Sequence, residues 1–180
     1  IATGLALSGK VVFVYSGGNF PTMRCLEQIR NDICYHKANV KIISIGIGFT
    51  YGILGVSHHA VQDISIIRSL PNIAILSPCD LIETELSTHA IVEYPGPCYM
   101  RLGRSDTVYK SDPEFNIGRA ITIQSGEDIT LIATGNMVHI ALQGSELLLS
   151  NGIITGVISL HSIKPLDYSV AKEDLPKNTK

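Results

Sequence analysis

The chain has 180 residues, of which 45% are hydrophobic and 17% are charged, and its formal net charge is −2 at pH 7. It can therefore bury a sizeable core, and its scattered cations form no basic stripe for binding nucleic acid. Its apolar runs stop short of the roughly 20 residues that cross a membrane as a helix, and it shows no signal-peptide pattern. We expect a folded cytoplasmic protein that binds neither nucleic acid nor membrane.

The cysteines and the two ends of the chain add two expectations. The four cysteines have neither CxxC spacing nor a compact framework, which predicts buried, reduced thiols rather than zinc ligands or disulfides. These cysteines are Cys25, Cys34, Cys79 and Cys98. The chain opens on IATGLALSGK, a pattern typical of the second half of a helix, and closes on polar LPKNTK. Neither end resembles a natural terminus, so we expect a piece of a longer protein.

Short runs rich in β-branched residues alternate with helical patterns along the chain. Strands are predicted over residues 11–16, 40–47, 72–77, 97–102, 128–134 and 154–160, and helices over residues 21–35, 58–70, 80–92 and 138–150. Most of the strands are continuously apolar, which is typical of strands covered on both faces. The expected fold class is α/β, with a mostly parallel sheet and helices on both faces. A polar segment at residues 104–118 leads into a partial second α/β domain.

Three loops at strand ends are candidate binding sites, because open α/β sheets bind ligands at the carboxyl ends of their strands. The first contains Gly46, Gly48 and Gly52, without the spacing of a dinucleotide-binding motif. The second is the turn YSGGNF, whose Phe20 can stack on a flat ring or belong to the core. Arg101 and Arg104 follow the fourth strand. Either arginine can bind a phosphate or carboxylate, or simply be a solvated charge.

The adjacent His58 and His59 need a separate interpretation. Neighbouring residues on a helix point about 100° apart, so the pair is poorly placed to share one metal ion. Ser57 is a good N-cap and would place His58 in the first turn of a helix, facing the glycine-rich loop. There the imidazole can bind an anionic or hydroxyl-rich ligand, or be an ordinary surface histidine.

Four ordered motifs resemble one family. The segments are SHHAVQDISIIRSLPNIAILSPCD, PGPCYMRLGR, GEDITLIATGNMV and SLHSIKPLD. Together they are similar to the carboxyl-terminal half of the transketolase family, which includes transketolase, deoxyxylulose-phosphate synthase and the β subunits of 2-oxo-acid dehydrogenases. The segment NFPTMRCLEQIRND most resembles the split transketolases, whose two halves are separate chains.

The resemblance implies a domain plan and an activity. Residues 1–112 would form a domain that binds the pyrimidine of thiamine diphosphate, and residues 118–180 would begin the transketolase C-terminal domain. The activity would be transfer of a two-carbon ketol unit between sugar phosphates. The diphosphate and its Mg²⁺ would be held by an amino-terminal half or subunit, in a homodimer or heterotetramer. This chain alone would then be inactive.

Residue roles also follow from the resemblance. Phe20 matches an aromatic that packs on the aminopyrimidine ring of the cofactor. His58 matches a catalytic, substrate-contacting histidine, and Arg104 matches an arginine that holds the substrate phosphate. His161 and Lys164 match a motif for which we expect a structural role.

Departures from the family pattern leave alternatives open. Gly17 and Leu54 replace residues that some transketolases use at the aromatic turn and on the sugar. The family's cofactor-activating glutamate would lie upstream of Ile1. A deoxyxylulose-phosphate synthase, a 2-oxo-acid dehydrogenase β subunit and a non-catalytic partner chain are the rival readings. Because family active sites lie between chains, we also expect an exposed apolar interface.

Overall fold

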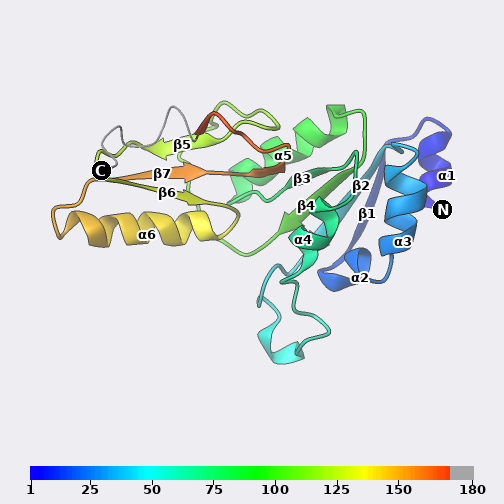
Figure 1. The fold of residues 1–180 in the computed structure, drawn as a ribbon, viewed down its shortest axis with the longest axis horizontal. Helices are drawn as coiled ribbons and strands as arrows, with labels where there is room; N and C mark the ends of the chain where they lie inside the picture. Colours follow the sequence, from blue (N-terminus) through cyan, green and yellow to red (C-terminus); the bar gives the residue numbers. More distant parts are fainter. Residues whose placement is uncertain (171–180) are drawn as a thin grey trace.

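The computed structural model describes residues 1–170, which form two α/β units lying side by side along the long axis of the molecule (Figure 1). The helices are α1 (Ala2–Leu7), α2 (Asn19–Thr22), α3 (Leu26–Gln28), the π-helical turn η1 (Ile29–Cys34), the 3₁₀ turn η2 (Gly52–Leu54), α4 (Asp63–Arg68), α5 (Leu81–Glu93) and α6 (Met137–Leu149). The strands are β1 (Val12–Gly17), β2 (Val40–Ile45), β3 (Ala74–Leu76), β4 (Cys98–Leu102), β5 (Ile121–Gln124), β6 (Ile129–Ala133), β7 (Thr155–Ser159) and β8 (Ser162–Lys164).

The larger sheet has the order β1-β2-β4-β3-β8, parallel except for β8, which runs antiparallel to β3. Successive side chains of a strand face opposite sides of a sheet. Ile42 and Tyr99 accordingly join a core with Ile67 of α4 on one face, whereas Ile43 packs on the other face in a core with Ile91 of α5. The sheet is covered on both sides, which confirms the expected fold class.

The smaller sheet has the order β5-β7-β6, with β6 and β7 parallel and β5 antiparallel to β7. Helix α6 packs against β6 and β7 (Figure 1), and this sheet and helix are the second α/β domain that the sequence predicts. The strands β5 and β8 were not predicted. They have four and three residues, too few to give a clear pattern.

Two expected helices differ in the structure. The helix predicted over residues 21–35 is divided, because Cys25 has φ −106° and ψ 15°, outside the helical region. The helix predicted from residue 58 begins only at Asp63. Ala60 cannot join it, because its N–H donates to Gly48 O and its carbonyl accepts from Gly48 N, both at 2.9 Å. His58 therefore lies in a loop, which corrects its expected place in the first helical turn.

A buried carboxyl group joins the two units. Glu83 of α5 accepts hydrogen bonds from Cys79 N at 2.6 Å, Tyr109 Oη at 2.9 Å and Ser159 Oγ at 2.8 Å. Burial raises the pKa of Glu83, while these donors oppose that rise. The helix is capped as predicted, with Glu83 N donating to Asp80 Oδ1 at 2.9 Å. This cluster holds α5, the inter-domain segment and β7 together.

The exposed cysteine corrects one expectation. Cys34, Cys79 and Cys98 are buried free thiols, as predicted, but Cys25 is exposed. It lies where the chain interrupts the helical winding between α2 and α3, and its Sγ contacts Phe20 O at 3.8 Å.

Candidate functional site

A loop of residues 46–62 follows β2 and projects from the carboxyl edge of the large sheet (Figure 1). The bridges of Ala60 to Ile47 and Gly48 close its base. Asn19 secures it from the β1–α2 turn, because its Nδ2 donates to His59 O and to Val56 O, the latter at 3.4 Å. The two turns are thus fixed to one another at the edge where ligands bind in sheets of this kind.

The contact between the turns leaves no room for a side chain at Gly18. A Cβ on Gly18 would lie 2.7 Å from Ala60 Cβ, well inside van der Waals contact. Gly46 has φ +84°, and a Cβ there would overlap the ring of Tyr51. The glycines of this region therefore serve close packing of backbones rather than a dinucleotide phosphate.

His58 lies beside Phe20. Their ring centroids are 5.1 Å apart at 83°, an edge-to-face arrangement, and Tyr51 lies 6.2 Å from the imidazole on another side. Ser57 is not a helix cap, because its Oγ lies 3.0 Å from His58 Nδ1. Nε2 makes no hydrogen bond within residues 1–170, so this nitrogen is available to a ligand. The half-buried imidazole can accept or donate a proton there.

His59 has a different environment from His58. Its Nε2 lies 3.0 Å from Gly52 O, and its ring packs edge-on against Phe49 with centroids 5.0 Å apart. These contacts stay within the projecting loop. His59 therefore stabilises the loop, as expected for the second histidine of the pair.

Phe20 forms part of the wall of an open pocket of about 480 Å³ between the β1–α2 turn and η1. Val14, Ile29 and Ile42 supply apolar wall, and the guanidinium of Arg24 lies 4.7 Å from the centre of the Phe20 ring. A Cβ at Gly17 would lie 3.6 Å from that ring, so glycine leaves this side of the phenyl ring uncovered. An uncovered aromatic ring in an apolar pocket fits a flat heterocycle such as an aminopyrimidine.

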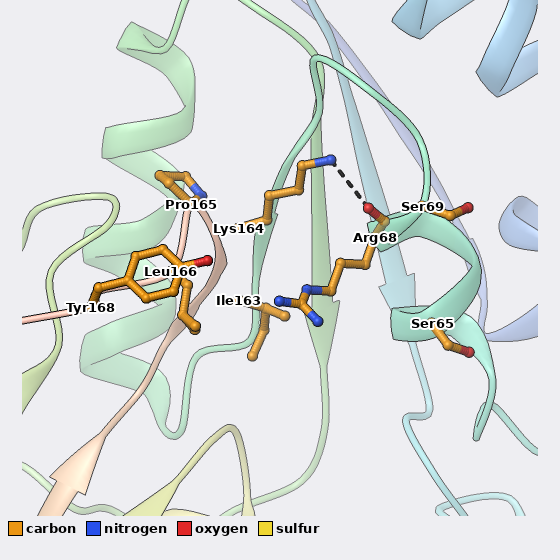
Figure 2. Close-up of a pocket in the computed structure, with 8 residues that line it drawn as sticks. All are labelled: Ser65, Arg68, Ser69, Ile163, Lys164, Pro165, Leu166 and Tyr168. Carbon is orange, nitrogen blue, oxygen red and sulfur yellow. Dashed lines mark hydrogen bonds between the residues drawn. The ribbon is translucent and has the colours of Figure 1, made fainter. Parts of the chain in front are cut away.

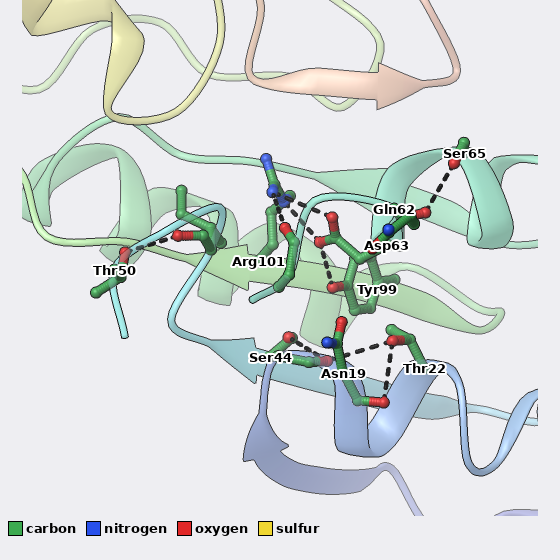
Figure 3. Close-up of polar contacts among 12 residues, drawn as sticks. Asn19, Thr22, Ser44, Thr50, Gln62, Asp63, Ser65, Tyr99 and Arg101 are labelled. Atoms are coloured by element: carbon green, nitrogen blue, oxygen red, sulfur yellow. Dashed lines mark hydrogen bonds and ion pairs between the residues drawn. The ribbon is translucent and has the colours of Figure 1, made fainter. Parts of the chain in front are cut away.

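The two arginines after the fourth strand have separate environments. Arg101 belongs to β4 and points inward, where its Nε lies 2.8 Å from Asp63 Oδ2 (Figure 3). This buried ion pair corrects the expectation that Arg101 is open to a ligand. Arg104 lies just beyond β4, exposed, and has no hydrogen-bond or ion-pair partner in the described part of the chain. Of the two, only Arg104 is free to bind an anion at this edge.

His161 and Lys164 lie away from the projecting loop and make internal contacts. His161 is fully buried and stacks on Phe115 with centroids 4.1 Å apart, and burial lowers its pKa to about 4. Lys164 Nζ donates to Arg68 O at 3.2 Å and to Leu70 O, at the edge of a pocket of about 700 Å³ (Figure 2). These contacts are consistent with the structural role that the motif implies.

The sequence interpretation missed Asn19 and Asp63. Asp63 lies four residues before the buried Ile67, so the helical pattern placed a carboxylate on the buried face of its helix. That conflict was a usable signal, because a buried charge needs a partner. Asn19 had no comparable signal, since its partners lie 37 and 40 residues away in the sequence.

Residues 1–170 contain no cluster of three or more His, Cys, Asp or Glu side chains that could hold a metal ion. Among the helices of this region, none is long and apolar enough to cross a membrane.

A parallel sheet covered on both faces, with an uncovered aromatic ring, a histidine and a free arginine at its carboxyl edge, defines an α/β ligand-binding unit. The chain belongs to the transketolase family. Residues 1–109 match the model of the transketolase pyrimidine-binding domain, and residues 118–180 match that of the transketolase C-terminal domain.

Individual relatives agree with this assignment. A putative transketolase C-terminal section of Methanocaldococcus jannaschii is 41% identical over 177 residues, and one of the two subunits of an apulose-4-phosphate transketolase of Phocaeicola vulgatus is 40% identical over 176. Each alignment covers 96% of this chain and 56% of the relative. A solved split-gene transketolase, described as an inactive β4 tetramer, superposes with a TM-score of 0.88 at 36% identity, covering 96% of this chain and 56% of the other. The chain thus spans about half the length of these relatives.

Proposed function

We propose that the chain supplies the pyrimidine-binding half of a transketolase-type active site, which transfers a two-carbon ketol unit between sugar phosphates. Residues 1–112 would be the pyrimidine-binding unit, and residues 118–180 the start of the C-terminal domain. The observation that carries the proposal is the edge-to-face pair of Phe20 and His58 at the mouth of an open pocket, in a chain of this family.

Thiamine diphosphate, when bound, supplies the carbon nucleophile that takes up the two-carbon unit. Phe20 packs against its aminopyrimidine ring, for which the uncovered phenyl face and the apolar pocket are suited. The diphosphate and Mg²⁺ are held by the partner chain. This division is consistent with the absence of a metal-binding cluster among residues 1–170.

His58 contacts the substrate through Nε2. Ser57 Oγ and the ring of Phe20 hold the imidazole, and Nε2 remains open to a sugar hydroxyl or carbonyl oxygen. At that atom the imidazole donates a hydrogen bond or transfers a proton, a role that typically contributes about 100- to 10,000-fold in rate.

Arg104 binds the terminal phosphate of the sugar. Its guanidinium is exposed after β4, at the same edge as His58, and is not paired with any carboxylate of residues 1–170. The name of the Phocaeicola relative includes a sugar phosphate, apulose-4-phosphate, which supports a substrate with an anionic end. A planar guanidinium is suited to such a group because it can donate two parallel hydrogen bonds.

The partner is an amino-terminal, diphosphate-binding subunit in an assembly of two or more copies of each chain. Phe49, Ile53 and Val56 expose their side chains on the projecting loop, so an apolar surface is available beside the site. The solved relative made of β chains alone is described as inactive, which supports the expectation that this chain needs its partner for activity.

Titration calorimetry with the full-length polypeptide tests the proposal. Thiamine diphosphate and Mg²⁺ are titrated into the chain alone and then into its mixture with the amino-terminal subunit. We expect binding and ketol transfer only in the mixture. Phe20→Leu should weaken cofactor binding, whereas Phe20→Tyr, which keeps the ring, should retain it. No binding in the mixture, or equal binding by both variants, would overturn the proposed role of Phe20.

Substrate assays separate the related alternatives. A ketose phosphate as donor should support turnover, and pyruvate should not. Turnover of pyruvate would indicate a deoxyxylulose-phosphate synthase or a 2-oxo-acid dehydrogenase instead. Arg104→Gln should raise KM for the phosphorylated sugar, while Lys110→Gln, an exposed cation in the inter-domain segment, should leave it unchanged. Cofactor binding without any turnover would favour a non-catalytic partner chain.

A further inference from the structure

An ion pair lies buried beneath the projecting loop. Arg101 Nε and Nη2 donate to the two carboxylate oxygens of Asp63, at 2.8 and 3.2 Å, and Tyr99 Oη donates to Oδ2 at 2.7 Å (Figure 3). Asp63 and Tyr99 are 0% exposed and Arg101 is 9% exposed. The group thus joins β4 to the first residue of α4, with both ends of its carboxylate occupied.

This network also reaches the loop that carries His58. Arg101 Nη2 lies 3.4 Å from Ala60 O, the same carbonyl that accepts from Gly48 N. From the opposite side, Asn19 Nδ2 donates to His59 O. The backbone that follows His58 is therefore held at consecutive residues by side chains from two different strand ends.

We propose that Arg101 and Asp63 are positioning residues that set the place of the His58 imidazole relative to Phe20. The inference rests on the proposed function, because it assigns the purpose of the pair to His58. Apolar residues could fill this volume without the cost of removing two charges from water. What a guanidinium adds is direction, since one rigid fork binds both carboxylate oxygens and is aimed at the Ala60 carbonyl.

The proposal predicts an effect on turnover without an effect on cofactor binding. Phe20 belongs to the β1–α2 turn and does not contact the ion pair, so the affinity for thiamine diphosphate should be unchanged. Displacement of a catalytic group by about 1 Å can lower a rate by about 100-fold. We therefore expect kcat to fall by that order when the pair is replaced.

The main variant is the triple substitution Asp63→Leu, Tyr99→Phe and Arg101→Met, which leaves no unpaired buried charge or hydroxyl group. Buried ion pairs replaced by apolar residues of similar volume often retain stability, so loss of the fold is not the expected result. A milder variant, Arg101→Lys, keeps the charge but lacks the planar fork. Ile91→Val, in the core on the opposite face of the sheet, is the matched control for a small loss of packing.

The position of His58 is measured directly by NMR of histidine-labelled protein, in the assembled protein without cofactor. The Phe20 ring, edge-on at 5.1 Å, shifts the imidazole proton signals. We expect these signals to move in the triple variant and in Arg101→Lys, and to stay in Ile91→Val. Unchanged His58 signals with unchanged kcat would overturn the inference. Should the triple variant fail to fold, Arg101→Lys decides.

The two measurements keep the inference separate from the proposed function. If the wild-type assembly transfers no ketol unit, the proposed function fails, while the NMR signals still report whether the ion pair positions His58. If the signals move but kcat and KM remain at wild-type values, His58 is positioned by the pair without acting in catalysis, and the catalytic part of the inference is wrong.

Discussion

His161 should make the folded state sensitive to mild acid. Its ring is 0% exposed, stacks on Phe115 at an interplanar angle of 24°, and makes no hydrogen bond through either nitrogen within the described region. Burial lowers its pKa from 6.5 to about 4. The folded state thus favours the neutral imidazole. Its stability is complete above pH 6.5 and is lost as the pH falls from 6.5 toward 4, because only the unfolded chain then binds the proton.

The size of the effect follows from the two pKa values. Lowering the pH from 7.5 to 5.0 should reduce the free energy of unfolding by about 2 kcal/mol through His161 alone. Urea unfolding of the full-length polypeptide at the two pH values measures this loss. His161→Phe keeps a flat ring against Phe115 and removes the titrating group, so its loss should be smaller by about that amount. His36→Asn, an exposed histidine, is the control.

A result that refutes the reasoning is simple to recognise. If wild type and His161→Phe lose the same free energy of unfolding between pH 7.5 and 5.0, the folded protein accommodates a protonated His161. The imidazole would then have a hydrogen-bond partner or contact with water in solution.

Three further perturbations follow from buried contacts. Because burial raises the pKa of Glu83, stability should fall as the pH rises above the ordinary carboxyl value, and Glu83→Gln should reduce that dependence in urea unfolding between pH 5 and 8. Lys41→Met should cost roughly 2 kcal/mol or more in the same assay, because Lys41 Nζ donates to Tyr94 O and Gly96 O at 2.7 and 2.6 Å and both carbonyls would lose it. Gly18→Ala should cost about 1–3 kcal/mol in thermal unfolding, since the new methyl group would lie 2.7 Å from Ala60 Cβ. An unchanged midpoint in any of these variants would contradict the corresponding contact.

The sequence predicted elements whose pattern is local. The apolar run around Ile42 and Ile43 fills both faces of the sheet, and one strand therefore reports the architecture by itself. Asp80 caps α5 as its spacing indicated, and Gly152 adopts φ +79° after α6, as expected for a helix C-terminus. Short strands such as β8 lack such a pattern, since three residues do not show a period.

The site was harder to predict because its contacts are distant in sequence. The residues around His58 have a helical pattern, and only the bonds between Ala60 and Gly48 prevent a helix there. Arg101 resembled a free cation until Asp63, 38 residues earlier, came to lie beside it. In both cases an interaction between separate segments replaced the local preference, which is the usual limit of reasoning from pattern.

The two candidate groups of the site are held in different ways, and this difference has a consequence for function. Phe20 lies in α2, directly after β1, and its position follows from the sheet itself. His58 lies in a loop of residues 46–62 that depends on Asn19, Ala60 and the ion pair for its place. Loss of one loop contact should therefore move His58 while leaving Phe20 in position. Substitutions in the loop contacts should alter turnover and substrate selection, whereas those in the β1–α2 turn should alter cofactor affinity first.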